Sequence, residues 1–198
     1  MADVKIINLP VQQPASTDYM PLTDGVTTYK TTLASAVSSI SISPIILKYE
    51  LASGSNGGGV TGTTWNDRPL NTKYGDLNNL CVLSNPNFTL VTGIYWVKAR
   101  VATANSGIAT TGGDQRLRLY NVTAGGVYAG GVGIGVYQPS SYNDGVPPEL
   151  NTFINISSPT TFKLQHWSNG TRNTFGMGAA QSIPSTNEIF AEVVILKL

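Results

Sequence analysis

The sequence predicts an all-β protein, a jelly-roll β-sandwich preceded by a small extended arm, and three observations support this prediction. First, only 12% of the 198 residues are charged, against about 25% in an average globular chain. Second, hydrophobic residues make up 41% of the chain and glycines number 21, while Thr, Ser and Asn supply much of the polar surface. Hydroxyl and amide side chains are typical of strands and turns rather than of exposed helix faces. Third, short alternating apolar segments are separated by turn residues.

The arm covers residues 1–44 and contains only short pieces of expected structure. Two extended segments, "VKIINLP" and "DYMPL", each include a proline, which removes a donor from a strand ladder. The turn signal "TDG" and the β-prone run "VTTYKTTL" follow, and Thr32 is placed to cap a brief helix over "LASAVSSI". A hairpin and helix of this size bury too little apolar surface to offset their ordering entropy. We therefore expect the arm to dock onto another subunit.

The domain over residues 45–198 begins with strands whose two faces differ. "IILKYELAS" is followed by the Gly-rich stretch "GSNGGGVTG", which we interpret as a flexible loop with a ligand loop as the alternative. "TWNDRPLN" predicts a short edge strand because it carries a proline. In "IYWVKARVATA", Tyr95 and Val97 fall on one face and Ile94 and Trp96 on the other.

The second half of the domain continues in the same way. "QRLRLYNVT" alternates, with Arg116 and Arg118 expected outward, and "FINISSPTTFKLQHW" predicts two strands around a turn. "TFGMGAA" also alternates, and "EIFAEVVILKL" is apolar on both faces, as in a central strand that is covered on both sides. About eight to ten strands in one domain predict a two-sheet sandwich.

Composition excludes several function classes. The net charge is +1 and no basic cluster could neutralise a row of phosphates, so no nucleic-acid binding is expected. The single cysteine, Cys81, permits no intrachain disulfide and no Cys-based metal site, and its apolar surroundings predict burial. The start lacks the pattern of a signal peptide, and no apolar run approaches the roughly 18 residues of a membrane span. We expect cytosolic synthesis, no membrane insertion and no cofactor.

The sequence offers little support for an enzyme. His166 is the only histidine and no "GxSxG" elbow occurs, so we interpret this residue as a strand-end histidine beside Trp167. "GGVGIGV" lacks the Lys-Ser/Thr of a phosphate loop and reads as a bare strand face, in the core or at a symmetry axis. A paired-acid glycosidase stays open as an alternative, because folding could bring distant carboxylates together.

Aromatic residues beside predicted loops are the candidate ligand contacts. Flat aromatic faces with Asn, Asp and Gln neighbours suit sugars, whose apolar C–H faces stack on rings; plugging of the sandwich ends is the alternative. Asp114, Asp144 and Glu149 raise a calcium alternative, although their spacing matches no calcium loop and plain turns are favoured, so no metal site is predicted. The predicted ligand-binding residues are Trp65, Tyr137, Tyr142, Asp144 and Trp167, with Tyr74 and Tyr128 in similar settings.

Five segments of the domain together resemble the tumour-necrosis-factor/complement-C1q jelly rolls. They are "ELASGSNGGGVTGTTWNDRPLNT", "LSNPNFTLVTGIYWVKARV", "RLRLYNVT", "TFKLQHW" and "EIFAEVVILKL". The core "F-T-L-x-x-G-x-Y" is similar to the strand pair on which those domains trimerise. The resemblance therefore implies a homotrimer, with Phe88, Tyr95 and Val97 at the trimer interface or in the core.

Residues 7–37, "INLPVQQPASTDYMPLTDGVTTYKTTLASAV", separately resemble the N-terminal attachment segment of phage fibre proteins, with Met20 where that pattern has Val. The two resemblances imply a homotrimeric surface protein of a tailed-phage virion that is fixed to other virion proteins through its arm. Together with the aromatic residues beside the loops, they lead us to expect a non-enzymatic tail-fibre or head-fibre component whose domain binds host polysaccharide. The alternatives are a capsid decoration protein without a receptor and a free C1q-like lectin. The predicted attachment residues are Leu9, Pro10, Asp18, Tyr19, Pro21, Gly25, Tyr29 and Leu33.

Overall fold

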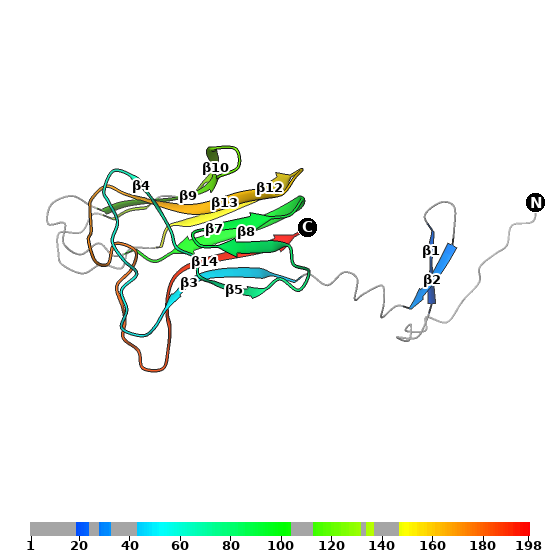
Figure 1. The fold of residues 1–198 in the computed structure, drawn as a ribbon, viewed down its shortest axis with the longest axis horizontal. Coiled ribbons are helices and arrows are strands. Elements are labelled where there is room, and N and C mark those ends of the chain that lie inside the picture. Colours follow the sequence, from blue (N-terminus) through cyan, green and yellow to red (C-terminus); the bar gives the residue numbers. More distant parts are fainter. Residues whose placement is uncertain (1–18, 24–27, 33–42, 104–112, 132–133, 137–146) are drawn as a thin grey trace, which may run out of the picture. The chain divides into compact units, whose positions relative to one another are not determined.

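The chain divides into two compact units, Met1–Ile42 and Ser43–Leu198. In the first unit, β1 (Tyr19–Thr23) and β2 (Thr28–Thr32) pair as an antiparallel hairpin, while Asp24 and Gly25 of the expected turn lie outside the described residues. The expected helix that follows Thr32 lies outside the described part of the chain. The computed structural model describes residues 19–23, 28–32, 43–103, 113–131, 134–136 and 147–198 (Figure 1).

The predicted attachment residues lie partly in this hairpin. Tyr19 pairs with Thr32, Pro21 with Lys30, and Tyr29 with Leu22. The remaining predicted attachment residues lie outside the described residues; they are Leu9, Pro10, Asp18, Gly25 and Leu33. Their role in attachment stays a prediction.

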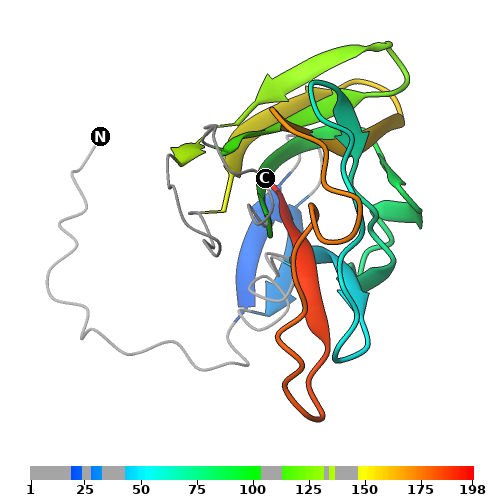
Figure 2. The same cartoon turned by 90° about the vertical axis from the view of Figure 1, so that its left-hand side faces the viewer.

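The second unit is a sandwich of two antiparallel sheets, which confirms the predicted all-β jelly-roll class (Figures 1 and 2). The first sheet has five strands in the order β12 (Glu149–Ile156), β8 (Gly93–Val101), β14 (Glu188–Lys197), β3 (Ile45–Leu51) and β5 (Thr72–Gly75). The path of the second sheet runs β10 (Gly126–Gly130), β9 (Gly113–Asn121), β13 (Thr160–Ser168), β7 (Asn87–Leu90) and β6 (Cys81–Ser84). Two short strands complete its seven: β4 (Trp65–Asp67) beside β13 and β11 (Ile134–Val136) beside β9.

The hydrophobic core lies between the two sheets and follows the alternation in the sequence. On β8, Tyr95 and Val97 are fully buried, while Ile94 on the opposite face is 47% exposed. On β9, Leu117 and Leu119 point inward, as predicted. Cys81 is buried in the same core, and burial raises the pKa of its thiol to about 12, so it stays a neutral thiol.

The C-terminal strand β14 is central in its sheet, as predicted, with β8 on one side and β3 on the other. Val193 on its inner face is fully buried and lies opposite Ala99 of β8 and Leu47 of β3. The outer face is only partly covered, because Val194 and Leu196 remain half-buried. The expectation that both faces are covered is therefore met on the inner side alone in this single chain.

The predicted strand over "TFGMGAA" is wrong: residues 173–177 form turns. Its glycines allow close packing against the stretch at 54–62. A Cβ on Gly176 would lie 2.5 Å from Cγ2 of Val60, and the amides of Met177 and Gly57 donate to the carbonyls of Gly58 and Gly178. The Gly-rich stretch is therefore a packed segment rather than a free loop, because a missing Cβ allows backbones to approach closely.

Arg68 joins these segments at one end of the sandwich. Its side chain is fully buried, and Nη2 donates to the carbonyls of Ala102 and Met177, each at 3.0 Å, and to that of Phe190. Burial lowers the pKa of this guanidinium to about 9. Arg68 therefore stabilises the junction of three chain segments through hydrogen bonds to backbone carbonyls.

Candidate functional site: an aromatic and basic patch on the seven-stranded sheet

Two tryptophans that are far apart in the sequence lie side by side on the outer face of the seven-stranded sheet. Trp65 of β4 pairs directly with Trp167 of β13, and Trp167 pairs on its other side with Arg116 of β9. Both indoles are half-buried and Arg116 is exposed. The three side chains form one row across three strands, because paired residues in a sheet point to the same side.

A second feature of this face is that aromatic rings and cations from β4, β9 and β13 alternate across it. The guanidinium of Arg118 lies 4.0 Å from the ring centre of Trp65 and 5.3 Å from that of Tyr120. The ammonium of Lys163 lies 5.4 Å from the ring centre of Tyr120. Each such contact contributes about 0.5–1 kcal/mol at an exposed site. The rings are thus held in place by cations before any ligand arrives.

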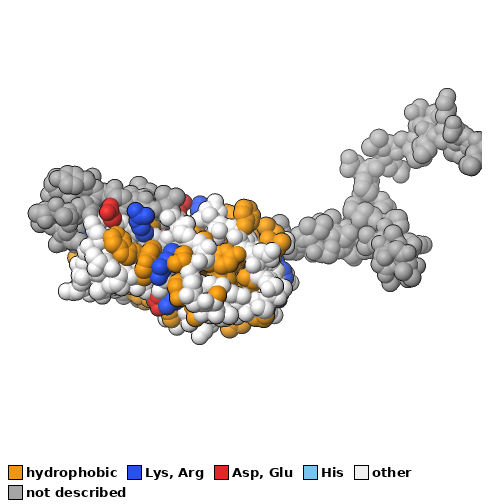
Figure 3. Space-filling view, turned by 90° about the horizontal axis from the view of Figure 1, so that it is seen from above, with side chains coloured by type: hydrophobic (Ala, Val, Ile, Leu, Met, Phe, Trp, Pro, Cys, Tyr) orange, Lys and Arg blue, Asp and Glu red, His pale blue; other side chains and the backbone are white. Residues whose placement is uncertain are grey.

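Polar contacts fix the same side chains. Lys163 Nζ lies 2.9 Å from Asp67 Oδ2, and Gln165 Nε2 donates to Asp67 Oδ1 at 2.7 Å. Arg118 Nε donates to Gln165 Oε1 at 2.7 Å. Partial burial lowers the pKa of the Arg118 guanidinium. We call this set the aromatic–basic patch; it comprises Trp65, Asp67, Arg116, Arg118, Tyr120, Lys163, Gln165 and Trp167. Figure 3 shows Lys and Arg side chains lying among hydrophobic ones on the face that it draws.

The structure unites two of the five predicted ligand-binding residues. Trp65 and Trp167 lie in the patch, on strands rather than on distal loops, while Tyr137, Tyr142 and Asp144 lie outside the described residues. Two other aromatic candidates lie elsewhere: Tyr74 donates to Glu50 Oε2, and the Tyr128 hydroxyl accepts from the Asn155 amide. The two tryptophans therefore lie on the outer face of a sheet and do not plug the ends of the sandwich.

The residues that the resemblance places at a trimer interface or in the core are all buried between the sheets. Phe88, Tyr95 and Val97 are each 0% exposed, and the Tyr95 hydroxyl donates to the carbonyl of Val91 at 2.8 Å. The opposite side of β8 bears Ile94 and the half-buried Trp96. Of the two places expected for these three residues, the structure of the single chain shows the core.

His166 lies in the interior of the sandwich and not beside Trp167, so the expected pairing with that indole is wrong. The two neighbours point to opposite sides of β13, because successive strand residues alternate. His166 is 0% exposed and its Nε2 contacts Oε1 of Gln115. Burial, reinforced by the positive charges of Arg68 and Arg172, lowers the pKa of His166 to about 2. A buried, neutral imidazole has no access to a substrate at the surface.

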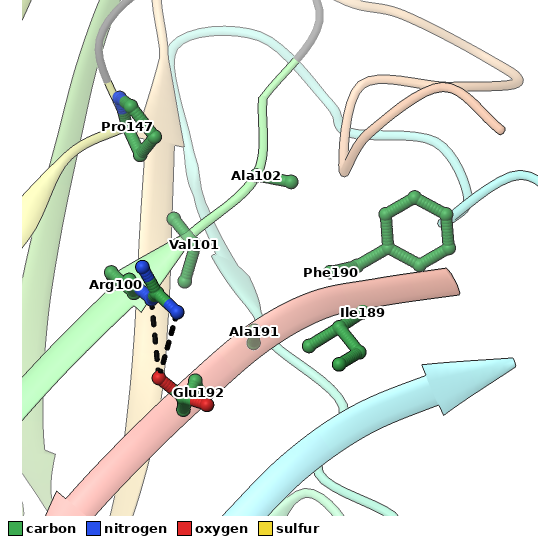
Figure 4. Close-up of a pocket in the computed structure, with 8 residues that line it drawn as sticks. All are labelled: Arg100, Val101, Ala102, Pro147, Ile189, Phe190, Ala191 and Glu192. Atoms are coloured by element: carbon green, nitrogen blue, oxygen red, sulfur yellow. Dashed lines mark hydrogen bonds and ion pairs between the residues drawn. The ribbon is translucent and has the colours of Figure 1, made fainter. Parts of the chain in front are cut away.

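A shallow pocket lies at one end of the five-stranded sheet, between β8 and β14 (Figure 4). Its polar lining is the ion pair of Arg100 with Glu192, at 3.0 Å, and its remaining lining is apolar, including Ile189, Phe190 and Pro147. The ion pair is internally satisfied, and the pocket lining contains no nucleophile next to a base. This pocket is therefore a weaker candidate for a functional site than the aromatic–basic patch.

The part of the chain that the structure describes contains no group of His, Cys, Asp and Glu residues suited to a metal ion. Of the calcium alternative, Asp114 and Glu149 are described and do not form such a group, while Asp144 lies outside. The described residues also contain no helix of the length and hydrophobicity that crossing a membrane requires.

Sequence reasoning missed most of the patch. Arg116 and Arg118 were expected to point outward, but nothing local linked them to Trp65, which lies on a strand distant in the sequence. Asp67, Lys163, Gln165 and Tyr120 were not singled out. The available signal was the alternation of large polar and aromatic residues on one face of 116–120 and 161–167, which marks a side-chain ladder on a sheet surface.

Comparison with known proteins gives similarity in fold only. No protein-family model matches the chain, and no curated protein matches it. Among solved structures, murine APRIL aligns over 80% of this chain and 100% of its own, with 10% identity and a TM-score of 0.46. Eiger TNF from S. frugiperda aligns over 79% and 92%, with 11% identity and a TM-score of 0.47. The PRD1 vertex protein P5 aligns over 79% and 96%, with 15% identity and a TM-score of 0.43.

Proposed function

We propose that this chain is a non-enzymatic, homotrimeric surface protein of a phage virion that binds host polysaccharide through the aromatic–basic patch. The observation that carries the binding role is the cross-strand pair of partly exposed tryptophans, Trp65 and Trp167. Adjacent indoles form a flat apolar platform for the C–H face of a sugar ring, and the exposed Arg116 beside them is a hydrogen-bond donor for its oxygens.

The outer face of the five-stranded sheet supports the trimer. Phe153, Trp96 and Leu196 form one row across β12, β8 and β14, and Phe153 is 66% exposed. Contiguous exposed apolar surface of this kind marks an interaction site. We call this set the apolar face; it comprises Ile46, Tyr74, Ile94, Trp96, Phe153, Val194 and Leu196.

The attachment role belongs to residues 1–44. Its support is the resemblance of residues 7–37 to phage fibre attachment segments, together with the two-stranded hairpin of β1 and β2. A two-stranded hairpin alone is only marginally stable in water. We therefore assign its partner to another virion subunit, by strand addition or side-chain docking.

The described residues offer no catalytic arrangement that would argue against a non-enzymatic role. His166 is buried and neutral, and Asp67 of the patch is already engaged by Lys163 and Gln165. A glycosidase needs two carboxyl groups that flank a glycosidic bond. A protein that binds without cleaving can still hold the particle firmly, because many copies that each bind weakly act together through avidity.

Two measurements test the proposal. Light scattering of the full chain in solution should give three times the chain mass of 21.0 kDa. Binding to a panel of neutral and acidic bacterial polysaccharides should be lost in Trp65→Ala. A trimer that binds no polysaccharide but labels phage heads in immunogold images would replace the proposal with a capsid decoration role. Release of reducing sugar from a bound polysaccharide would show that the chain is an enzyme.

A further inference from the structure

Trp167 offers the open stacking surface of the patch. The ring of Trp65 is covered by the guanidinium of Arg118 at 4.0 Å, whereas no ring or cation contact involves Trp167 within the described part of the chain. Trp167 is half-buried and lies between Trp65 and Arg116 in the strand register. A ligand ring placed on Trp167 therefore lies next to Arg116.

Arg116 differs from the other cations of the patch because it lacks a partner there. Lys163 is paired with Asp67, and Arg118 is stacked on Trp65 and bonded to Gln165. Arg116 is exposed, and none of the ion pairs among the described residues includes it. The exposed Asp114, on the same face of β9, forms no ion pair with Arg116 either. A guanidinium that forms no ion pair thus stands beside a half-buried indole that has no ring or cation contact among the described residues.

We infer that Trp167 and Arg116 bind one acidic sugar residue, with its ring on the indole and its carboxylate on the guanidinium. This inference rests on the proposed polysaccharide-binding function and names its substrate class, a polysaccharide containing uronic or sialic acid. A planar guanidinium donates two parallel N–H···O bonds to a carboxylate, which an ammonium cannot do. Trp65, held beneath Arg118, extends the platform to the neighbouring sugar.

Nucleic acid also combines stacking with negative charge, but the patch does not favour it. A single strand needs a basic groove that follows a row of phosphates. Here Asp67 and Asp114 lie on the same face as the three cations, and two of these cations are already engaged. One free guanidinium matches one carboxylate better than it matches a phosphate backbone.

The test uses the full-length protein and matched polymers. Alginate, polygalacturonate, hyaluronate and polysialate are immobilised, each beside its carboxyl-reduced form, and binding is measured by interferometry at low and physiological salt. Neutral dextran, mannan and galactan, dextran sulfate and oligothymidylate complete the panel. The variants are Arg116→Gln, Arg116→Lys and Trp167→Ala. The control is Lys197→Gln, which removes one exposed positive charge at the end of β14.

The expected result is binding to at least one acidic polymer that is weakened about tenfold or more by carboxyl reduction, the loss expected for a charge-assisted hydrogen-bond pair. Arg116→Gln should cause the same loss and bind both forms alike, Arg116→Lys should recover only part, and Lys197→Gln should bind as the wild type. Trp167→Ala should weaken binding to both forms.

Three outcomes overturn the inference while the proposed function stands: equal binding to an acidic polymer and its reduced form, wild-type binding by Arg116→Gln, or binding to neutral polymers alone. Stronger binding to dextran sulfate or oligothymidylate than to every carboxylated polymer also overturns it. Binding to no polysaccharide of the panel ends the proposed function itself, and the inference with it. Because Arg116 is exposed, its variants are expected to fold, and circular dichroism checks this for all four proteins.

Discussion

The two outer faces of the sandwich are built from the same antiparallel strands and carry different chemistry. The apolar face of the five-stranded sheet presents Phe153, Trp96 and Leu196 in one row, with its ion pairs grouped at one end around Glu192. Two lysines lie beside members of the apolar face, Lys98 opposite Val194 and Lys48 near the Tyr74 ring, whereas in the aromatic–basic patch Arg118 contacts the rings of Trp65 and Tyr120 and Lys163 contacts that of Tyr120. Contiguous apolar surface favours a permanent protein partner, whereas separated rings with polar neighbours suit a hydrated ligand. The difference supports our proposal that one face serves assembly and the other recognition.

The largest expected effect comes from Tyr95→Asp, which places a carboxylate in the core. Tyr95 is 0% exposed, so the charge would be buried without a partner, and we expect a loss of more than about 4 kcal/mol in the free energy of unfolding. Urea denaturation measures this loss. Ile94→Asp, one residue away on the apolar face, should leave the unfolding free energy of the isolated chain almost unchanged. Similar losses in both variants would contradict the assignment of faces.

If the proposed trimer forms through the apolar face, Phe153→Asp should dissociate it without unfolding the chain. A carboxylate buried at the interface without a partner costs at least about 3 kcal/mol per subunit. Light scattering should give the mass of the monomer. Val82→Asp is the matched control, because Val82 is also 66% exposed but lies on β6 of the other sheet. A trimer that survives Phe153→Asp and breaks with Val82→Asp would move the interface to the seven-stranded sheet.

Lowering the pH should destabilise the fold through His166, which lies behind the patch on the inner face of the seven-stranded sheet. Its folded-state pKa of about 2 lies below the ordinary value of 6.5, so between these values the unfolded chain binds one more proton. The stabilisation that neutral His166 provides is therefore complete above about pH 6.5. Below that pH the free energy of unfolding falls by about 1.4 kcal/mol per pH unit. Denaturation at pH 6.5 and 5.0 should differ by about 2 kcal/mol. In His166→Gln that difference should disappear.

The smallest expected effect is that of Lys163→Met on the patch. This change removes the ion pair with Asp67 and the cation near Tyr120, both at a partly exposed site. The expected cost is about 0.5–1 kcal/mol in unfolding free energy, with an unchanged trimer mass. Lys163→Arg should restore most of it. A loss of unfolding free energy as large as that of Tyr95→Asp would mean that the side chains of the aromatic–basic patch belong to the core and not to a recognition surface.

Local patterns predicted the strands well where one face is buried. The alternation in residues 94–101 and 116–119 assigned the inward and outward side chains correctly, because a strand with one dry face repeats every two residues. The same rule failed at "TFGMGAA". There, the alternating glycines allow close contact with Val60 and Phe190, and the segment turns instead of extending. A period of two in glycine does not distinguish a strand from a tightly packed turn.

The sequence by itself determined the all-β class, the central position of the last strand and the burial of Cys81, because each depends on hydrophobicity and short periods. Only the tertiary structure brought Trp65, Trp167 and Arg116 into one row, since strand order decides which distant residues become neighbours. It also placed His166 behind the patch, in the interior. Sheet register is set by the packing of the whole sandwich, and a surface site made of cross-strand pairs exists only once that register is formed.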